Sequence, residues 1–453
     1  MRHSGTRRFD ALRRPPPGKR ITLRFVHVYM TAAHAGYGSE QVPVGGAAAI
    51  CERLCRAWGH RQDVRVTLLG PGPEAPDGVE YVRIPLLEES PSALDEWRYA
   101  AFCRAFEREI TRRVLRAVGP RVVLSHDISE GPSFGALAAA NIPTACMVHV
   151  DVVEYFARIY LRDAISAPRA ARWWRLLGRL PMPDVLRLVF DKQAAAVAHC
   201  DAMIVPAPGM ADMLAACYPG QGKVHVLPWG SEARDAGPSE VSAARARLAA
   251  AWNLSDGEQV LLTLSRISPE KGQDVLLRAV AEGEARGEAP AGLRVVICGA
   301  PAYMQGASFA RRLRALASTL ATPVVFAGHL GGAEKQAALS LGTVFVSASR
   351  HESYGLTTME AMRASLPVVA LRTHGAEATL DERSGVLVPP GTRVEGRLWD
   401  ALRDLLRDPS RRAALVEGAR ERAAAVPFAR AADDLLKILS DAARPASRIP
   451  AAP

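Results

Sequence analysis

Short apolar runs alternate with longer helical patterns along most of the chain. In the first half the apolar runs cover residues 21–30, 64–70, 122–127, 144–150, 202–207 and 224–230. Between them, segments such as 45–59 and 99–119 carry apolar residues at intervals of three and four, the period of an amphipathic helix. Strands that alternate with helices form parallel sheets covered on both faces. The pattern therefore predicts an open α/β domain.

A second series of apolar runs begins after residues 230–259, a segment bearing glycine, serine and acidic residues around one helix. These runs cover residues 260–266, 293–300, 324–330, 344–349, 366–372 and 385–390. An amphipathic helix at 428–443 follows them and is expected to pack back on the first domain. We predict a tail at 1–19, an N-terminal domain at 20–232, a C-terminal domain at 233–427, a returning helix at 428–445 and a tail at 446–453.

The overall composition is that of a soluble globular protein. Of the 453 residues, 49% are hydrophobic and 6% are aromatic, which argues against bulk disorder and a fibrous fold. No apolar stretch reaches the length of a membrane span, and no apolar segment near the N-terminus precedes a cleavage site. The seven cysteines are scattered, which argues against a disulfide framework. We therefore expect a cytoplasmic protein.

The net charge of +10 fits a polyanion, an anionic membrane surface or an anionic small substrate. Much of the excess lies in the first twenty residues, and a second basic block, residues 157–190, holds seven arginines beside Trp173 and Trp174. This block either contacts an anionic membrane, at the inner face of which the protein would then be peripheral, or is a solvated cover over an acceptor pocket. Nucleic acid is not an expected partner, because no known nucleic-acid-binding signature is present.

Two cations, Arg266 and Lys271, follow one apolar run and precede a helix that is expected to begin near Gly272. Backbone N–H groups and the helix dipole favour an anion at such a helix start. In open parallel sheets ligands bind beyond the carboxyl ends of the strands, so the cleft between the two domains is the expected site. The pair is therefore predicted to clamp a diphosphate in that cleft.

The stretch "SASRHESYGLTTMEAM", residues 347–362, combines a strand, a glycine-containing loop and a helix start. The N–H groups near Gly355, Leu356 and Thr357 are expected to point at a phosphate. Glu360, one turn into the helix, suits the two hydroxyls of a ribose, because a carboxylate accepts hydrogen bonds from both. Glu352, nearer the loop tip, suits the hydroxyls of a sugar. With the two cations, these residues predict a nucleotide-sugar site.

The C-terminal half resembles the donor domain of retaining family 4 glycosyltransferases. The resemblance rests on "SRISPEKGQDVLLRAV", "SASRHESYGLTTMEAMRASLPVVA" and "GAEATLDERSGVLVPPG", and more weakly on "VGGAAAICERLCRAWG" and "MVHVD" in the first half. It implies the GT-B architecture, in which two Rossmann-like doubly wound parallel-sheet domains face a central cleft. It also implies retaining transfer from a nucleotide-diphosphate sugar, with a UDP-sugar favoured, to an acceptor hydroxyl. A saccharide, a lipid-linked carrier and a small metabolite are all open as the acceptor.

The resemblance also implies roles for individual residues. Those matching Glu360, Arg266 and Lys271 hold the ribose and the diphosphate, and the one matching Glu352 lies near the donor sugar. Gly45 and Gly46 match a glycine-rich loop that approaches the donor from the first domain. His149 matches a histidine that faces the donor sugar, although Val150 separates it from the acid that usually follows directly.

In the mechanism commonly given for this family, the departing phosphate takes the proton of the acceptor, so no dedicated base is required. We expect no cofactor and no metal ion, since Cys51 and Cys55 lack clustered ligand partners and no Asp-x-Asp motif is evident. Among the histidines at strand ends, His126 is a weaker candidate for the cleft than His149. Another GT-B enzyme, such as a sugar-nucleotide epimerase or a phosphorylase, and a non-catalytic nucleotide or polyanion binder remain open alternatives.

Overall fold

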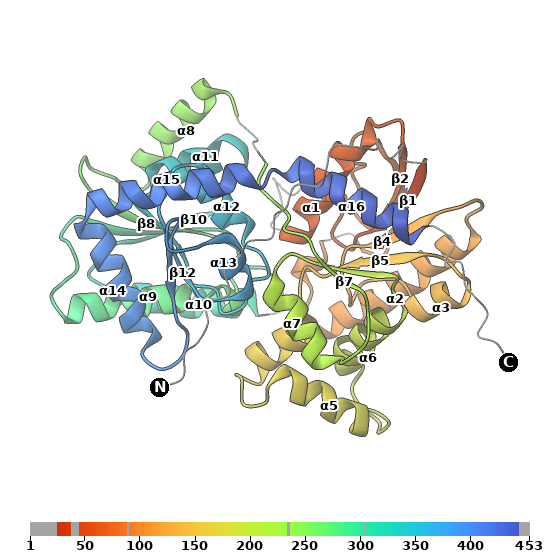
Figure 1. Ribbon diagram of the computed structural model, residues 1–453. Coiled ribbons are helices and arrows are strands. Elements are labelled where there is room, and N and C mark those ends of the chain that lie inside the picture. Colours follow the sequence, from red (N-terminus) through yellow and green to blue (C-terminus); the bar gives the residue numbers. More distant parts are fainter. Residues whose placement is uncertain (1–24, 38–44, 88–89, 233–235, 303–304, 444–453) are drawn as a thin grey trace, which may run out of the picture.

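The computed structural model describes residues 25–37, 45–87, 90–232, 236–302 and 305–443. In these ranges the chain forms two parallel sheets that lie side by side, each covered by helices (Figure 1). The predicted α/β class with two doubly wound sheets is thereby confirmed. The predicted tails at 1–19 and 446–453, the first residues of the run at 21–30, the domain boundary at 233 and the last residues of the segment 428–445 lie outside the described ranges.

The first sheet has seven strands in the order β3-β2-β1-β4-β5-β6-β7, and all neighbours run parallel. Its strands are β1 (Val26–Thr31), β2 (Val64–Gly70), β3 (Glu80–Arg83), β4 (Val122–Ser125), β5 (Thr144–Met147), β6 (Ala202–Val205) and β7 (Val224–Val226). All six apolar runs of the first half form strands. The apolar pattern did not reveal β3, because this edge strand has no fully buried residue and therefore no apolar run.

The helices of the first half cover both faces of this sheet. They are α1 (Gly46–Gly59), η1 (Pro91–Ala93), α2 (Glu96–Arg116), α3 (Phe134–Ala139), α4 (Val152–Tyr155), η2 (Phe156–Tyr160), α5 (Ala167–Leu177), α6 (Asp184–His199) and α7 (Pro208–Cys217). On α1, the side chains of Ile50, Cys51, Leu54, Cys55 and Trp58 recur at helical spacing and are buried against the sheet. The two cysteines four residues apart therefore belong to the core.

The second sheet has six parallel strands in the order β10-β9-β8-β11-β12-β13. Its strands are β8 (Gln259–Leu264), β9 (Leu293–Cys298), β10 (Val324–Gly328), β11 (Val344–Ser347), β12 (Val368–Leu371) and β13 (Val386–Val388). Its helices are α8 (Pro238–Ala251), η3 (Pro269–Lys271), α9 (Gln273–Ala285), α10 (Gly306–Ala317), α11 (Gly332–Leu341), α12 (Leu356–Arg363), α13 (His374–Thr379), α14 (Val394–Arg407) and α15 (Pro409–Ala425).

The chain crosses between the two halves twice, and the two crossings are hydrogen-bonded to each other. The Ser231 N–H donates to the Val426 carbonyl over 2.8 Å, and the Phe428 N–H donates to the Ser231 carbonyl over 2.8 Å. After the second crossing, α16 (Phe428–Ala442) packs against α1 and β4 of the first half (Figure 1). One buried apolar cluster contains residues of both sheets and of α16, so the core continues from one half into the other.

Candidate active site

A cleft of about 780 Å³ lies between the two halves of the molecule. Its lining includes residues that follow β1, β4 and β5 of the first sheet and β8, β9, β10 and β11 of the second. The strand order reverses between β1 and β4 in one sheet and between β8 and β11 in the other. Open parallel sheets bind ligands beyond the carboxyl ends of their strands at such reversals. The cleft therefore lies where the topology predicts a ligand, and it is large enough for one.

The loop between β8 and α9 brings the two predicted cations to the cleft. Lys271 Nζ lies 2.7 Å from Glu352 Oε2, and Arg266 NH2 lies 3.4 Å from Glu270 Oε1. Gly272, the N-cap of α9, has φ +63°, and a Cβ atom there would collide with the Ala348 carbonyl oxygen of the next loop. Glycine is therefore required for this close approach, which brings Lys271 within reach of Glu352.

The loop between β11 and α12 carries Glu352 and the predicted anion-binding N–H groups. Gly355 is the N-cap of α12 with φ +88°, a left-handed conformation that favours glycine, and Leu356 and Thr357 begin the helix and line the cleft. Burial raises the pKa of Glu352, but the neighbouring Lys271 ammonium outweighs it, and the pKa lies below its ordinary value. Glu352 is therefore a carboxylate at neutral pH.

Glu360 lies at the point where the two halves meet beside the cleft. Its Oε1 accepts hydrogen bonds from Lys335 Nζ over 2.9 Å and from Arg53 NH2 of the first half over 3.2 Å. Arg53 also pairs with Glu232 through Nε over 3.2 Å. Two cationic partners hold the carboxyl group in place, which suits the recognition of hydroxyl groups.

The start of α1 faces the start of α12. Gly45 is the N-cap of α1 with φ +87°, Gly46 begins the helix, and both line the cleft. A Cβ atom built on Gly46 would lie 3.5 Å from Leu356 Cδ1, so the two helix starts approach each other closely. Both helix dipoles have their positive ends at this place, which favours an anion between them.

His149 lines the cleft, while His126 is fully buried behind it. The two rings stack at 5.5 Å, and His149 Nε2 lies 3.3 Å from His126 Nδ1. On its other side His149 contacts the Trp229 ring at 5.4 Å. Burial lowers the pKa of His149 to about 3 and lowers that of His126 as well. Both imidazoles are therefore neutral at pH 7, and His149 can exchange hydrogen bonds with a ligand but carries no charge.

The first-sheet side of the cleft contains a polar cluster that the sequence did not reveal. Glu130 accepts a short hydrogen bond from the Tyr99 hydroxyl, and its Oε1 lies 3.8 Å from His34 Nε2. Burial, and then the nearby charge of Glu130, raise the pKa of Asp127. The sequence offered one signal of this cluster, Glu130 in "HDISEGP", which closely follows the apolar run at 122–127. Its partner Tyr99 belongs to a helix much earlier in the sequence, so no local pattern joins the two.

Glu154 forms a second contact between the halves. His374 Nε2 lies 3.0 Å from its Oε1, and His351 Nε2 lies 3.7 Å from its Oε2, both from the second half. Arg158, one turn further along, pairs with the same carboxylate at 2.9 Å. Burial opposes its ionisation, but the nearby His351 and the hydrogen bond with His374 hold the pKa of Glu154 well below its ordinary value. The hydrogen bond to Glu154 in turn raises the pKa of His374.

In the described ranges, no three His, Cys, Asp or Glu side chains are grouped so that they could hold a metal ion. No helix within the same ranges is long and apolar enough to cross a membrane. All seven cysteines are buried and unpaired.

Two sequence models of known families match the chain in adjacent segments. The family described as "Glycosyltransferase Family 4" matches residues 44–232, and the family described as "Glycosyl transferases group 1" matches residues 258–408. The first segment contains the N-terminal half of the cleft, and the second contains Arg266, Lys271, Glu352 and Glu360. Together the two segments cover most of the chain.

Individual relatives match over shorter stretches. A D-inositol 3-phosphate glycosyltransferase of Stackebrandtia nassauensis is 35% identical over 262 residues, which are 56% of this chain and 57% of that protein. A GDP-mannose-dependent alpha-(1-6)-phosphatidylinositol monomannoside mannosyltransferase of Mycolicibacterium smegmatis is 36% identical over 182 residues, 38% of this chain and 44% of that one. The matches thus span about half the length of these curated relatives.

Among solved structures, sucrose-phosphate synthase from Thermosynechococcus elongatus matches with a TM-score of 0.69. The match covers 92% of this chain and 98% of the synthase chain, at 19% sequence identity. At this identity the likeness concerns the fold alone, and it confirms the predicted architecture of two parallel-sheet domains facing a cleft.

Proposed function

Because the chain belongs to glycosyltransferase family 4, we propose that it transfers a sugar from a nucleotide-diphosphate sugar to an acceptor hydroxyl. The observation that carries this proposal is the convergence of Arg266, Lys271 and two helix starts on one cleft, beside two glutamates. The cations and helix starts suit the diphosphate. Glu360 suits the ribose, and Glu352 suits the transferred sugar.

In this proposal the anomeric carbon exchanges its bond to the diphosphate oxygen for a bond to the acceptor oxygen on the same face, which retains configuration. Negative charge develops on the leaving diphosphate as the bond breaks, and preorganised cations stabilise it. The proton of the acceptor moves to the departing phosphate, so the reaction consumes no protein base. His149, neutral at pH 7, contributes a hydrogen bond near the donor sugar.

The donor is a nucleoside diphosphate sugar whose base and sugar are to be determined. The family resemblance favours a UDP-sugar, whereas the name of one relative contains GDP-mannose. For the acceptor, the name of another relative contains inositol 3-phosphate. Phosphorylated compounds are therefore candidate acceptors, beside saccharides, lipid-linked carriers and small metabolites. An epimerase, a phosphorylase and a non-catalytic nucleotide binder are the alternatives.

A thermal-shift panel with UDP, GDP and ADP, each with and without chelator, tests the donor site. A ligand that binds only the folded protein adds roughly 2.7 kcal/mol at about 100 times its dissociation constant. We expect selective stabilisation by one diphosphate, unchanged by chelator. No stabilisation by any of the three would overturn the proposal.

Incubation with the matching sugar nucleotides separates the alternatives once a diphosphate binds. An epimerase would change the donor sugar without an acceptor, and a phosphorylase would show the absorbance of pyridoxal phosphate. Sugar release or transfer that depends on Lys271 supports the transferase, whereas an unreactive donor points to a non-catalytic binder.

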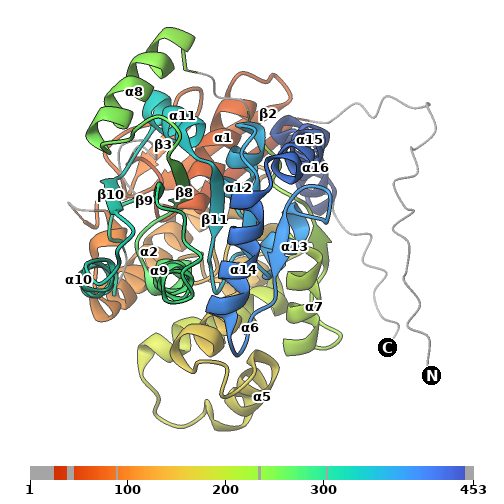
Figure 2. The same cartoon turned by 90° about the vertical axis from the view of Figure 1, so that its left-hand side faces the viewer.

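The surface of α5 supports a peripheral contact with an anionic membrane. Trp173, Leu176 and Leu177 on this helix are 51%, 72% and 48% exposed. Exposed arginines accompany them, namely Arg169, Arg172, Arg175 and Arg179. The helix lies at the periphery of the molecule, away from both sheets (Figure 2). Apolar side chains that insert between arginines are typical of segments that lie on anionic lipid.

Co-sedimentation with vesicles tests this contact. We expect binding to vesicles that contain phosphatidylglycerol, little binding to pure phosphatidylcholine, and loss of binding in Trp173→Ser with Leu176→Ser. Equal binding of the wild type and this variant would contradict the proposed contact.

A further inference from the structure

The acceptor side of the cleft has an unusual composition for a site near a diphosphate. Its wall is formed by α2, the loop after β4, α4 with η2, and α6. The apolar part of this wall includes Ala100, Ile128, Phe156, Val185, Leu188 and Val189. Its acidic groups are Glu96, Asp127 and Glu130. Among the described residues that line the cleft on this wall there is no lysine and no arginine.

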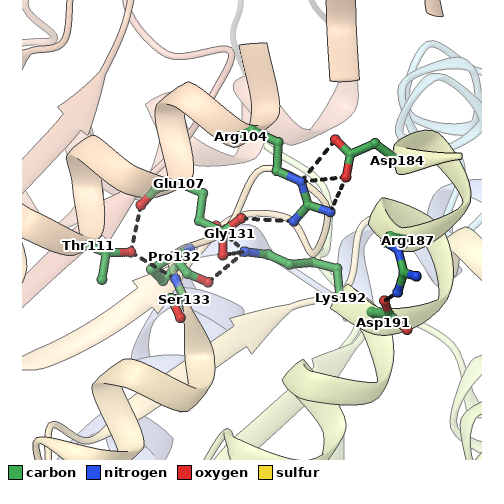
Figure 3. A network of polar contacts seen from close by, with 10 residues as sticks. All are labelled: Arg104, Glu107, Thr111, Gly131, Pro132, Ser133, Asp184, Arg187, Asp191 and Lys192. Atoms are coloured by element: carbon green, nitrogen blue, oxygen red, sulfur yellow. Dashed lines mark hydrogen bonds and ion pairs between the residues drawn. The ribbon is translucent and has the colours of Figure 1, made fainter. Parts of the chain in front are cut away.

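The helices that form this wall carry nine lysines and arginines, and none of these nine lines the cleft. Figure 3 shows Lys192 and Arg104 among them. Lys192 of α6 is buried, lies 2.8 Å from Glu107 Oε1, and donates to the carbonyl oxygens of Gly131 and Pro132 over 2.8 and 2.9 Å. Arg104 of α2 lies 2.8 Å from Asp184. Both cations therefore have internal partners.

The contacts of Lys192 also hold the loop that carries Glu130. Together with the hydrogen bond from the Ser133 N–H to Thr111 Oγ1 over 2.8 Å, they tie residues 131–133 to α2 and α6 (Figure 3). Glu130 itself is 9% exposed and lines the cleft. A fixed acid at the cleft wall can recognise one chemical group at a defined place.

Glu130 is ionised in this setting. Burial raises its pKa, but the hydrogen-bond partners His34 and Tyr99 outweigh burial, and the pKa of Glu130 lies below its ordinary value. A carboxylate accepts hydrogen bonds from hydroxyl groups and repels phosphate, and the repulsion is strong where water is excluded. A phosphorylated acceptor would meet this charge with no cation on the described wall to compensate.

We propose that this half of the cleft takes an acceptor without phosphate, which offers a hydroxyl to Glu130 and lays an apolar body against the wall of α2, η2 and α6. The inference rests on the proposed function, because it names the acceptor class of the same site. It separates this chain from any relative that acts on a phosphorylated acceptor.

Binding of paired probes to the protein saturated with its nucleoside diphosphate tests the inference. The neutral probe is octyl β-D-glucoside and the anionic probe is glucose 6-phosphate, both measured by calorimetry. We expect the neutral probe to bind at least about tenfold more tightly, a difference of 1.4 kcal/mol. Tighter binding of glucose 6-phosphate, or binding of neither probe while the nucleotide binds, would overturn the inference and leave the donor site intact. Absence of nucleotide binding would instead overturn the proposed function, and the inference with it.

Two variants locate the effect on the wall. Glu130→Gln keeps the shape of the side chain. It is expected to lower the affinity for the neutral probe about tenfold and to leave nucleotide binding unchanged. Glu109→Gln, on the same helix as Tyr99 but outside the cleft lining, is the matched control and should change neither. Leu188→Arg adds the missing cation and should create binding of glucose 6-phosphate. Unchanged probe affinities in both wall variants would contradict the assignment.

Discussion

The two sides of the cleft are built from the same kind of sheet and carry opposite chemistry. On the second-sheet side each of the cations Arg266, Lys271 and Lys335 faces a carboxylate, and a helix begins beside them. On the first-sheet side, the wall formed by α2, the loop after β4, η2 and α6 is apolar with acids, and none of its described lining residues is a lysine or an arginine. The cations that the first sheet contributes, Arg53 and Arg56, come from α1. The comparison teaches that the topology fixes where ligands bind, whereas the loops after the strands decide which ligands they are.

The largest expected effect is the loss of activity on removal of Lys271 from the second-sheet side of the cleft. In Lys271→Ala the leaving diphosphate loses a preorganised cation, and kcat should fall by about 10²–10³. Initial rates at saturating donor measure this. Lys437→Ala, an exposed lysine of α16 paired with Asp434, is the control and should retain full activity. A fall of kcat no larger than in this control would remove Lys271 from the proposed diphosphate site.

Removal of the charge on Glu360 should affect nucleotide binding rather than the chemical step. Glu360→Gln keeps the size of the side chain but weakens hydrogen bonds to the ribose, and we expect a dissociation constant about tenfold higher. Calorimetry with the nucleoside diphosphate measures it. Glu377→Gln, whose exposed carboxylate pairs with Arg372, serves as the matched control. Equal affinities of the two variants would argue against the ribose role.

The contact between the halves should depend on pH through His374. Its pKa is raised by the hydrogen bond to Glu154, so the stabilisation is complete below the ordinary histidine pKa and is lost as pH rises through the raised value. His374→Gln should therefore destabilise the protein more at pH 5.5 than at pH 8.5, by on the order of 1 kcal/mol. Urea unfolding at both pH values measures the difference.

The exposed His225 provides the control for this pH dependence. His225→Gln reports the effect of the same substitution at an exposed histidine outside the contact with Glu154. If His374→Gln showed no larger difference between pH 5.5 and pH 8.5 than this control, the charged contact to Glu154 would not contribute to stability.

The smallest effect concerns His149. Burial lowers its pKa to about 3, so the imidazole does not titrate between pH 5.5 and pH 8. The pH profile of kcat/KM should therefore have the same shape in the wild type and in His149→Asn. An ionisation near pH 6.5 that is present in the wild type and absent in the variant would show that His149 is charged during the reaction.

Much of the fold was predictable because buried parallel strands are short apolar runs. β9 illustrates this, since all six of its residues are buried. β3 was not predictable, because Glu80–Arg83 at the sheet edge has no fully buried residue. The pattern of alternating periods indicates which segments form strands, but an edge strand of this kind lacks the signal.

The site was predictable only where local sequence positions the residues. Lys271, Glu352 and Gly355 each follow a strand or begin a helix, so their place at the cleft follows from the topology. The pairing of Arg53 with Glu360 joins residues 307 positions apart, and no local pattern contains it. The cluster around Glu130 likewise depends on α2 passing beside the loop after β4. Such contacts arise from tertiary packing and are visible only in the folded structure.

The pairing of the two crossings restricts how the cleft can widen. Since Ser231 bonds to both Val426 and Phe428, the two connections form a single strap, and the strap acts as one pivot line. A rotation of the halves about this line would displace the rim of the cleft more than the wall that Trp229 forms beside His149, because displacement grows with distance from the axis.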